Sequence, residues 1–473
     1  MAMLVVAALL LCGSLAKLLI SPVAKIPGPW LTKVSSLPLK YHEFIPGRRM
    51  YIHRLHQQYG PIVRLSPNEV SFASLEAIRE IYASGGSGYN KTEFYDMFRQ
   101  FGMKTMFSTL DKRTHSQRKR ELADSYAMSN ILREPHVSTI RERAEPFVLQ
   151  GAALARSVDV YVFLHCYALD CVTHFMFHPG GLSSLNDAKN FQIMEEMTYH
   201  HSLQRNLLQY YLPKLAPYFP SWFKPRRAPK TNAYVQSITA QEHSDSHSLL
   251  GRLTQKESSL SHALIAAECK DHMAAGIDTT GDGLCFLMWE LSQPDHLHGE
   301  LCSATPDTPL DKLPYLEAVI KEGLRCAPPI PMSFPRYVPS GGRTIDGTFI
   351  PAGTIVSCQP YTLHRLDQDV FPDPDKFNPD RWMNSNGAIE RNRLFFAFGT
   401  GGRGCTGRNL AMVEMKILLR EVYSKYRTTV AADMTGCMDI DDQKNIFETK
   451  GSDLQVGVHG QGQLLVDVCE FML

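Results

Sequence analysis

The chain has 473 residues, is 44% hydrophobic and 21% charged, and carries a formal net charge of +1 at pH 7. This composition is typical of a globular protein with a large core, and the balanced charge gives no indication of a nucleic acid or a strongly acidic partner. The 11 cysteines include no CxxC pair, which argues against a disulfide framework or a zinc ribbon and favours a reducing compartment.

The amino-terminal segment is apolar enough to anchor the chain in a membrane. No charged residue occurs from Met1 to Ala16, and after Lys17 the apolar run resumes as far as Ile20. A helix of about 20 apolar residues spans a bilayer. A cleaved signal peptide is the alternative, because Ser14-Leu15-Ala16 resembles a cleavage site. We favour an uncleaved anchor at 1–20.

Positive charge predicts the orientation of this anchor. Lys17, Lys25 and Lys33 follow the apolar run, and no Lys or Arg precedes it. Positive residues favour the cytoplasmic side of a membrane. We therefore expect a single-pass protein whose body faces the cytosol.

The sequence after the anchor gives no reason to expect a second domain. Prolines in Ile26-Pro27-Gly28-Pro29-Trp30 predict a stiff hinge at 21–30. No internal repeat or low-complexity tract follows, and the Pro- and Gly-rich stretches at 212–229 and 327–353 are short. We expect one domain over residues 31–473.

Strand signals are few. Residues 61–72 alternate like a pair of strands with a turn at Pro67-Asn68. Residues 343–358 resemble a hairpin, with turn signals at Gly347 and at Pro351-Ala352-Gly353. The chain is therefore predicted to be mostly α with a minor β-sheet region.

Helical patterns account for most of the body. The longest is expected from about Ser261 to Ser292, because it contains no proline and Pro294 follows it. It is apolar on more than one face, so it should cross the interior. Further helices are expected at 112–134, 314–326 and 407–424.

A glycine-rich turn with a cysteine joins an apolar run to the last of these helices. Residues 393–424 place Arg403 and Cys405 there, where backbone N–H groups, a helix N-terminus and a cation would stabilise a thiolate. Gly399, Gly401 and Gly404 also spell GxGxxG, a dinucleotide-binding pattern. That alternative lacks an acidic residue at the end of a second strand, since the corresponding position lies near Glu421, inside the same helix.

Three further motifs carry chemistry. Ala275-Gly276-Ile277-Asp278-Thr279-Thr280 lies mid-way along the longest helix, where a threonine can bond back to a carbonyl one turn earlier. Glu322 and Arg325 lie three apart on one helix face. Phe377-Asn378-Pro379-Asp380-Arg381-Trp382 follows. Alone, the first is also compatible with a polar helix stripe, the second with a helical salt bridge, and Cys405 with a free surface thiol.

Together these motifs resemble those of the cytochrome P-450 superfamily. Phe398 to Gly407 matches the haem-binding signature FxxGxRxCxG at every fixed position, and residues 275–280, 322–325 and 377–382 resemble (A/G)Gx(D/E)TT, ExxR and FxPxRW. The sequence is most similar to the fungal secondary-metabolism branch. The resemblance implies that haem b (iron protoporphyrin IX) lies between the long central helix and the cysteine loop.

The resemblance also implies a role for each matched residue. Cys405 is expected to be the axial ligand of the haem iron, and Phe398, Gly401 and Gly407 to form the loop around the haem. Arg403 and Arg336 are expected to bind the haem propionates. Where the family usually has Trp and Arg, this sequence has His115 and Lys119, with Arg118 and Arg120 as alternatives to Lys119. Structural support is expected from a buried network of Glu322, Arg325 and Arg381, and proton delivery from Asp278 and Thr279.

The implied activity is monooxygenation, in which one oxygen atom of O2 enters an apolar small molecule such as a terpenoid, polyketide or alkaloid intermediate. Electrons would come from a separate NADPH-cytochrome P-450 reductase, and the membrane would be the endoplasmic reticulum. The alternatives are an oxygen-independent isomerase or dehydratase and a membrane-tethered haem sensor without catalysis. By analogy with the family, the substrate pocket is expected to include Phe94, Phe98, Phe101, Met103, Tyr210, Ile330 and Met332.

Overall fold

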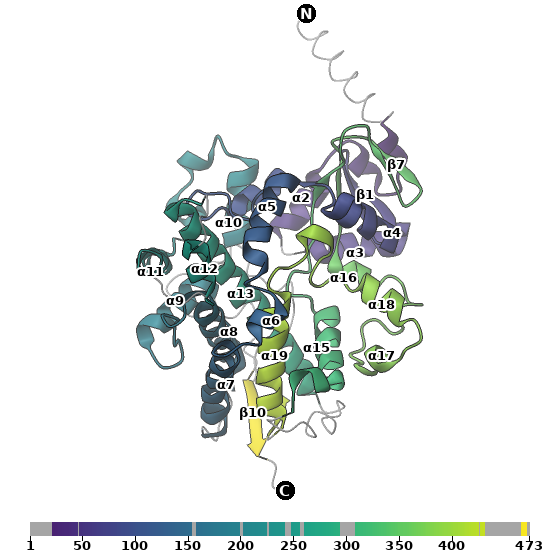
Figure 1. Cartoon of the computed structure of the whole chain (residues 1–473). Coiled ribbons are helices and arrows are strands. Elements are labelled where there is room, and N and C mark those ends of the chain that lie inside the picture. Colours follow the sequence, from purple (N-terminus) through teal and green to yellow (C-terminus); the bar gives the residue numbers. More distant parts are fainter. Residues whose placement is uncertain are drawn as a thin grey trace, which may run out of the picture.

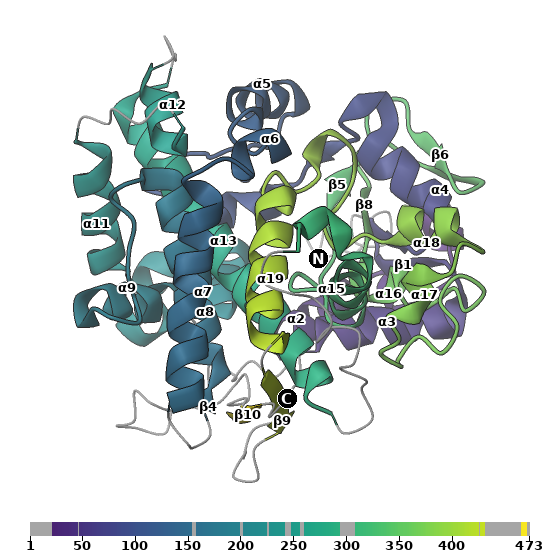
Figure 2. The same ribbon diagram turned by 60° about the horizontal axis from the view of Figure 1, so that its bottom comes forward.

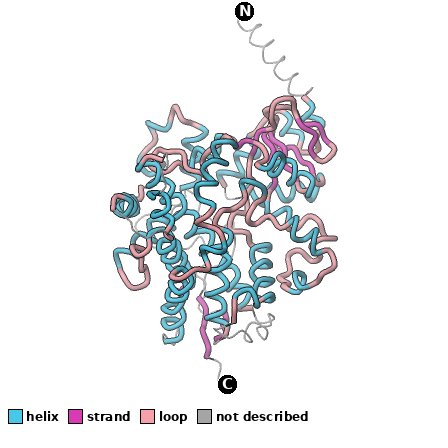
Figure 3. Tube along the Cα trace, viewed as in Figure 1, coloured by secondary structure: helices cyan, strands magenta, loops and turns pink. Residues whose placement is uncertain are grey.

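The structure is a computed structural model, and it describes residues 21–45, 47–153, 158–198, 202–224, 227–241, 247–255, 260–293, 308–424, 426–430 and 465–470. The anchor predicted at 1–20 lies outside the described residues. Helices make up most of the body, and most strands gather at one side of it, near the amino-terminal end (Figures 1 and 3). The predicted fold class, mostly α with a minor β-sheet region, is confirmed.

The α-helices are α2 (Leu37–Phe44), α3 (Arg48–Tyr59), α4 (Leu75–Ile78), α5 (Lys112–Ala123), α6 (Met128–Ile131), α7 (His136–Ala153), α8 (Val160–Phe177), α9 (Ala188–Thr198), α10 (Ser202–Tyr211), α11 (Pro229–Thr239), α12 (Leu249–Gln255), α13 (His262–Leu291), α15 (Pro314–Cys326), α16 (Pro360–Leu363), α17 (Asp380–Met383), α18 (Ala388–Leu394) and α19 (Arg408–Tyr423). The strands are β1 (Ile62–Ser66), β2 (Glu69–Phe72), β3 (Asn90–Lys91), β4 (Val158–Asp159), β5 (Arg336–Tyr337), β6 (Arg343–Ile345), β7 (Thr348–Ile350), β8 (Ile355–Cys358), β9 (Tyr426–Val430) and β10 (Leu465–Glu470).

The largest sheet has the order β1-β2-β8-β5-β3. β1 and β2 form the predicted antiparallel pair around 67–68. The hairpin predicted at 343–358 is only partly right. β6 and β7 do form one, around Asp346-Gly347. β8 instead leaves the hairpin and lies between β5, antiparallel to it, and β2, parallel to it with Glu69 opposite Ile355. No local pattern signals the pairing with β2, because the two strands are far apart in the sequence.

Helix ends follow capping chemistry where the sequence offers it. The Ser261 hydroxyl accepts a hydrogen bond of 3.3 Å from the Leu264 amide at the start of α13, and α15 has the predicted bounds. The single helix predicted at 112–134 is wrong, because α5 ends at Ala123 and α6 is a separate turn. Between them the Tyr126 hydroxyl lies 2.6 Å from Nδ1 of His272, a buried tertiary contact that overrides local helix preference.

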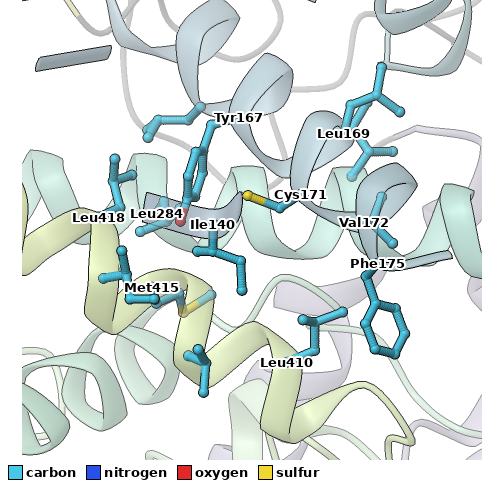
Figure 4. Close-up of a cluster of buried hydrophobic side chains, with 14 of the residues drawn as sticks. Ile140, Tyr167, Leu169, Cys171, Val172, Phe175, Leu284, Leu410, Met415 and Leu418 are labelled. Atoms are coloured by element: carbon cyan, nitrogen blue, oxygen red, sulfur yellow. The ribbon is translucent and has the colours of Figure 1, made fainter. Parts of the chain in front are cut away.

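The core lies between α8, α13 and α19 (Figure 2). In Figure 4, Tyr167 of α8 and Leu284 of α13 lie beside Met415 and Leu418 of α19, and all four are buried. The Tyr167 hydroxyl donates a 2.8 Å hydrogen bond to the carbonyl of Glu414. This core fixes α13, which carries the motif at 275–280, against the helix that follows the cysteine loop.

Among the described helices, α8 is apolar and long enough to cross a membrane, with a mean hydropathy of 1.3. However, 83% of that segment is buried inside the body. It is therefore accounted for as a core helix.

The packing of α19 can be tested with a matched pair of isoleucines. Ile417 is 0% exposed in the core, whereas Ile389 on α18 is 61% exposed. We expect Ile417→Ala to lower the free energy of unfolding by about 2–5 kcal/mol, because it removes buried methyl groups and leaves a cavity. Ile389→Ala should change it by about 0.5 kcal/mol or less. Urea unfolding followed by circular dichroism measures both, and equal effects would contradict the assignment of this core.

Candidate active site

The cysteine loop is a tight turn that ends at the start of α19. The amide of Cys405 donates a 2.8 Å hydrogen bond to the Phe398 carbonyl, which closes the turn. Gly401 has a φ of +66°, and a Cβ there would come within 2.3 Å of the Tyr82 carbonyl, so only glycine fits. Gly407 is the N-cap of α19. Helix α18, and not a strand, precedes this loop within residues 388–424, which makes the dinucleotide alternative wrong.

Cys405 differs from the six other cysteines whose side chains the structure describes, because it is exposed and they are buried. Nevertheless, burial is the largest influence on its thiol and raises its pKa, against the backbone N–H of Gly407 and the charges of Lys119 and Arg408. A side chain that is accessible and still desolvated faces a space inside the body. A bound metal ion deprotonates a coordinating thiol outright, so this setting is compatible with a sulfur ligand.

Five cationic or basic side chains gather beside this loop. They are Lys91, His115, Lys119, Arg336 and Arg403. Burial, together with the charges of Arg336 and Arg403, lowers the pKa of Lys91 well below its usual value. Burial and the neighbouring cations also lower the pKa of His115 to about 2, and burial and Arg336 lower that of Arg403 to about 10. The cluster therefore favours the binding of an anion.

The hydrogen bonds of the two arginines are incomplete. Arg403 donates 3.0 Å to the Leu110 carbonyl, and Arg336 donates 2.7 Å to the Tyr95 hydroxyl. Within the part of the chain that the structure describes, no acceptor lies beside Nε and Nη1 of Arg403 or Nε of Arg336. Buried donors without acceptors cost stability. Two carboxylates of a flat cofactor above Cys405 would supply the missing acceptors, so the residues present fit haem.

Lys119 contacts the cysteine loop directly. Its ammonium donates a 2.6 Å hydrogen bond to the Gly404 carbonyl, next to Cys405. By contrast, Arg118 donates 2.9 Å to the Thr109 hydroxyl and lies near Glu268, and Arg120 is exposed. Of the three candidates at this position, Lys119 is the one that the structure brings to the cysteine loop.

Lys91 was missed by the sequence reasoning. Its ammonium donates to the Phe107 carbonyl and lies 4.6 Å from the centre of the Tyr95 ring. β3 carries it into the site by pairing with β5, with Lys91 opposite Arg336. No local sequence pattern marks it, because its position depends on this strand pairing.

Glu322 is the centre of a buried ion network. Its carboxylate accepts hydrogen bonds of 2.9 Å from both Arg325 and Arg381, 2.8 Å from the Trp382 indole and 2.9 Å from the Asn378 amide. Glu322 and Arg325 are 0% exposed and Arg381 is 8% exposed. The structure thus joins all three residues of the predicted network.

His364 connects this network to the cysteine loop. Its Nδ1 lies 3.2 Å from the Arg325 carbonyl, and its Nε2 accepts a 2.8 Å hydrogen bond from the Phe396 amide. Burial and the charges of Arg325 and Arg365 lower the pKa of His364 to about 3, so the ring is neutral. Nδ1 is therefore the donor. The ring thereby holds the backbone at Phe396. Two residues later, the Phe398 carbonyl closes the cysteine turn.

The motif on α13 has the expected local geometry. The Thr279 hydroxyl donates a 2.6 Å hydrogen bond back to the Ala275 carbonyl, as threonines inside helices do. Ala275 is exposed although it lies mid-way along a buried helix. Burial, with the nearby charge of Asp282, raises the pKa of Asp278 to about 8. Asp278 can therefore hold and release a proton near neutral pH.

Comparison with known proteins agrees with this geometry. The family model for cytochrome P-450 matches residues 28–454. The chain belongs to the cytochrome P-450 family. It is 29% identical to the cytochrome P-450 monooxygenase tazI of Aspergillus terreus over 451 residues, which cover 90% of this chain and 91% of the relative. It is 28% identical to the monooxygenase orf2 of Aspergillus niger over 470 residues, covering 92% and 93%, and 29% identical to the monooxygenase stcB of Emericella nidulans over 424 residues, covering 84% and 80%.

Family membership makes this protein a haem-dependent monooxygenase, and haem b supplies the chemistry that activates oxygen. The chain's own residues have separate tasks around it. Cys405 would ligate the iron, with Lys119 and the helix N-terminus stabilising its negative charge. Arg336, Arg403 and Lys91 would orient the propionates. Asp278, whose pKa burial raises to about 8, would hold a proton at its carboxyl group.

The ion network provides a test of what fixes the loop. Glu322→Gln should lower the free energy of unfolding by about 3–5 kcal/mol, because it leaves the buried Arg325 and Arg381 uncompensated. The variant should also retain little haem. Burial alone would raise the pKa of Glu322, but both arginines lower it. The ionised Glu322 therefore contributes its full stabilisation above the unfolded-state pKa of a glutamate, about 4.3. That stabilisation is lost as the pH falls through the lowered pKa of Glu322 in the folded state. Haem content per chain and thermal unfolding measure the effect.

Asp311→Asn is the matched control. Asp311 lies three residues before the same helix, its side chain is 75% exposed and it pairs with the similarly exposed Lys312. An exposed pair contributes about 0–1 kcal/mol, so haem content should not change. Full haem content in Glu322→Gln would contradict the role given to the network.

Proposed function

We propose that this protein is a membrane-bound monooxygenase of secondary metabolism that oxidises a bulky apolar small molecule. The observation that carries the proposal is that one protein has both an intact proton-donating motif at Asp278 and Thr279 and a cluster of cationic side chains with unsatisfied donors around Cys405. A haem isomerase or a haem sensor has no need of that proton donor, which is why we place both alternatives second.

Aromatic side chains support an apolar substrate. Phe94 and Phe98 lie 5.7 Å apart between ring centres, and Phe98 lies 5.3 Å from Phe107. Helix α10, which carries Tyr210, packs on this segment. The ammonium of Lys270 on α13 lies 5.1 Å from the ring centre of Phe101. A wall of this kind favours terpenoid, polyketide or alkaloid intermediates over charged metabolites.

Electrons would come from an NADPH-cytochrome P-450 reductase. Within residues 112–120, Lys112, Arg113 and Arg120 are exposed on α5, the helix that also carries His115 and Lys119. A basic face beside the cofactor site is suited to an acidic flavoprotein surface. We propose this face of α5 as the place where the reductase docks.

Exposed apolar side chains support contact with a membrane. Leu37 and Tyr41 on α2 are 69% and 61% exposed, and Tyr218 after α10 is 84% exposed. The two segments adjoin, because the Lys40 ammonium lies 4.4 Å from the ring centre of Tyr211. Single exposed apolar residues are ordinary, but a group on adjoining segments marks an interaction surface. The full group is Trp30, Leu31, Leu37, Tyr41, Leu212, Leu215 and Tyr218.

The haem-thiolate assignment is tested with the absorbance spectrum of the reduced, carbon-monoxide-bound protein. We expect a strongly red-shifted Soret band in the wild type and its loss in Cys405→Ser, because a neutral hydroxyl cannot replace the thiolate as electron donor. Cys358→Ser is the control, since Cys358 is buried at the end of β8, the central strand of the sheet. An unchanged band in Cys405→Ser would sink the proposal. Turnover is then sought with reductase, NADPH and a panel of terpenoids, polyketides and alkaloids.

Membrane contact is tested by flotation of the body without residues 1–20 on phospholipid vesicles of endoplasmic-reticulum composition. We expect the body to float, and Trp30→Ser, Leu37→Ser and Tyr218→Ser together to lower the bound fraction about tenfold or more. The control is Met383→Ser with Ile389→Ser, which changes exposed apolar residues on α17 and α18. Equal flotation of both variants would contradict the surface.

A further inference from the structure

A histidine on α8 lies between two acceptors. His165 is 0% exposed. Its Nδ1 lies 2.8 Å from the Tyr161 carbonyl, and its Nε2 lies 3.3 Å from a carboxylate oxygen of Asp282 on α13. Neither acceptor can donate a proton to the ring, so an imidazolium with two N–H groups suits this position. Nδ1–H donates to the Tyr161 carbonyl, whereas the contact of Nε2 with Asp282 is an ion pair and not a well-aligned hydrogen bond.

Helix α13 presents two carboxyl groups towards this ring. Asp278 and Asp282 are four residues apart on α13, so they lie on one helix face. Gly281 lies beside them, and a Cβ there would come within 2.7 Å of His165 Nε2. The glycine thus allows the ring to lie directly against the helix backbone.

The three groups differ in access to solvent. The side chain of His165 is 0% exposed, whereas that of Asp282 is 20% exposed. Asp278 is desolvated, and its pKa is raised to about 8 by burial and by Asp282, while His165 opposes this rise. Burial lowers the pKa of His165, but Asp282, Asp278 and the Tyr161 carbonyl together raise it above its ordinary value. The three groups therefore form one coupled proton-binding unit, in which Asp282 is the partly exposed group in contact with the buried His165.

We propose that His165 and Asp282 form the outer part of the proton path: once Asp278 has given its proton away, the His165 imidazolium gives its Nε2 proton to the Asp278 carboxylate, and Asp282, protonated from solvent, returns a proton to the same nitrogen. The proposal rests on the proposed function, because it extends the path that ends at Asp278. His165 and Asp282 are positioning residues that act through Asp278. Each passage consumes one solvent proton and leaves all three groups as they began.

The test uses the full holoenzyme with reductase and NADPH, and it needs no identified substrate. Oxygen consumption under these conditions takes up protons, whether it ends in hydrogen peroxide or in water. We expect Asp282→Asn and His165→Gln to slow NADPH-dependent oxygen consumption about tenfold or more, and the ratio of rates in H2O and D2O to increase. His174→Gln, which changes a half-buried histidine further along α8, is the matched control.

A second readout does not depend on turnover. Infrared difference titration of the Asp278 carboxyl group, assigned with Asp278→Asn, should show its pKa rise in His165→Gln, because the nearby positive charge is gone. Should His165→Gln fail to load haem, Asp282→Asn decides, since Asp282 is partly exposed. The carbon-monoxide spectrum checks that each variant is loaded.

The outcomes separate the two proposals. Loaded variants with wild-type isotope ratios and an unchanged Asp278 titration would reduce His165 and Asp282 to an ion pair that joins two helices. A wild-type protein that carries haem but consumes no oxygen with NADPH and reductase would instead overturn the proposed function.

Discussion

The structure depends on the carboxylate of Glu322. Its oxygens accept hydrogen bonds from Arg325, Arg381, Trp382 and the Asn378 amide, which joins α15 to the segment around α17. A buried ion network contributes little net stability, because the desolvation of the charges offsets their attraction. The network instead fixes one relative arrangement of these segments, because donors from both converge on a single acceptor group, the Glu322 carboxylate. Through His364 that arrangement extends to the loop of Cys405.

The cation cluster makes the cofactor part of the fold. Burial lowers the pKa values of Lys91 and Arg403, and repulsion by the charge of Arg336 lowers both further. A dianionic ligand relieves this repulsion and supplies acceptors for the arginine donors, so its binding free energy stabilises the folded state. The folded protein is therefore less stable without its cofactor than with it.

Features encoded locally could be predicted from the sequence, and features made by packing could not. The bounds of α15, the ends of α13 and the turn between β1 and β2 follow from proline, capping and alternation signals. The break between α5 and α6 results from the contact of Tyr126 with α13, and β8 leaves its hairpin for a strand almost three hundred residues earlier in the chain. In the site, the contiguous motifs were readable. Lys91, His165 and His364 were not, because each acquires its partners only when distant elements meet.

Helix α13 shows how the fold exchanges local stability for close approach. A glycine inside a helix costs about 1 kcal/mol relative to alanine, and α13 contains Gly276, Gly281 and Gly283. A Cβ at Gly276 would come within 2.6 Å of Val172, and one at Gly283 within 3.0 Å of Met415. The glycines therefore let α8 pack on one side and α19 on another. With the helix fixed from both sides, the back-bonded Thr279 and the carboxyl group of Asp278 keep defined positions relative to the cysteine loop. If Asp278 and Thr279 deliver protons as we propose, folding has already placed them, so no turnover has to bear the entropic cost of positioning them.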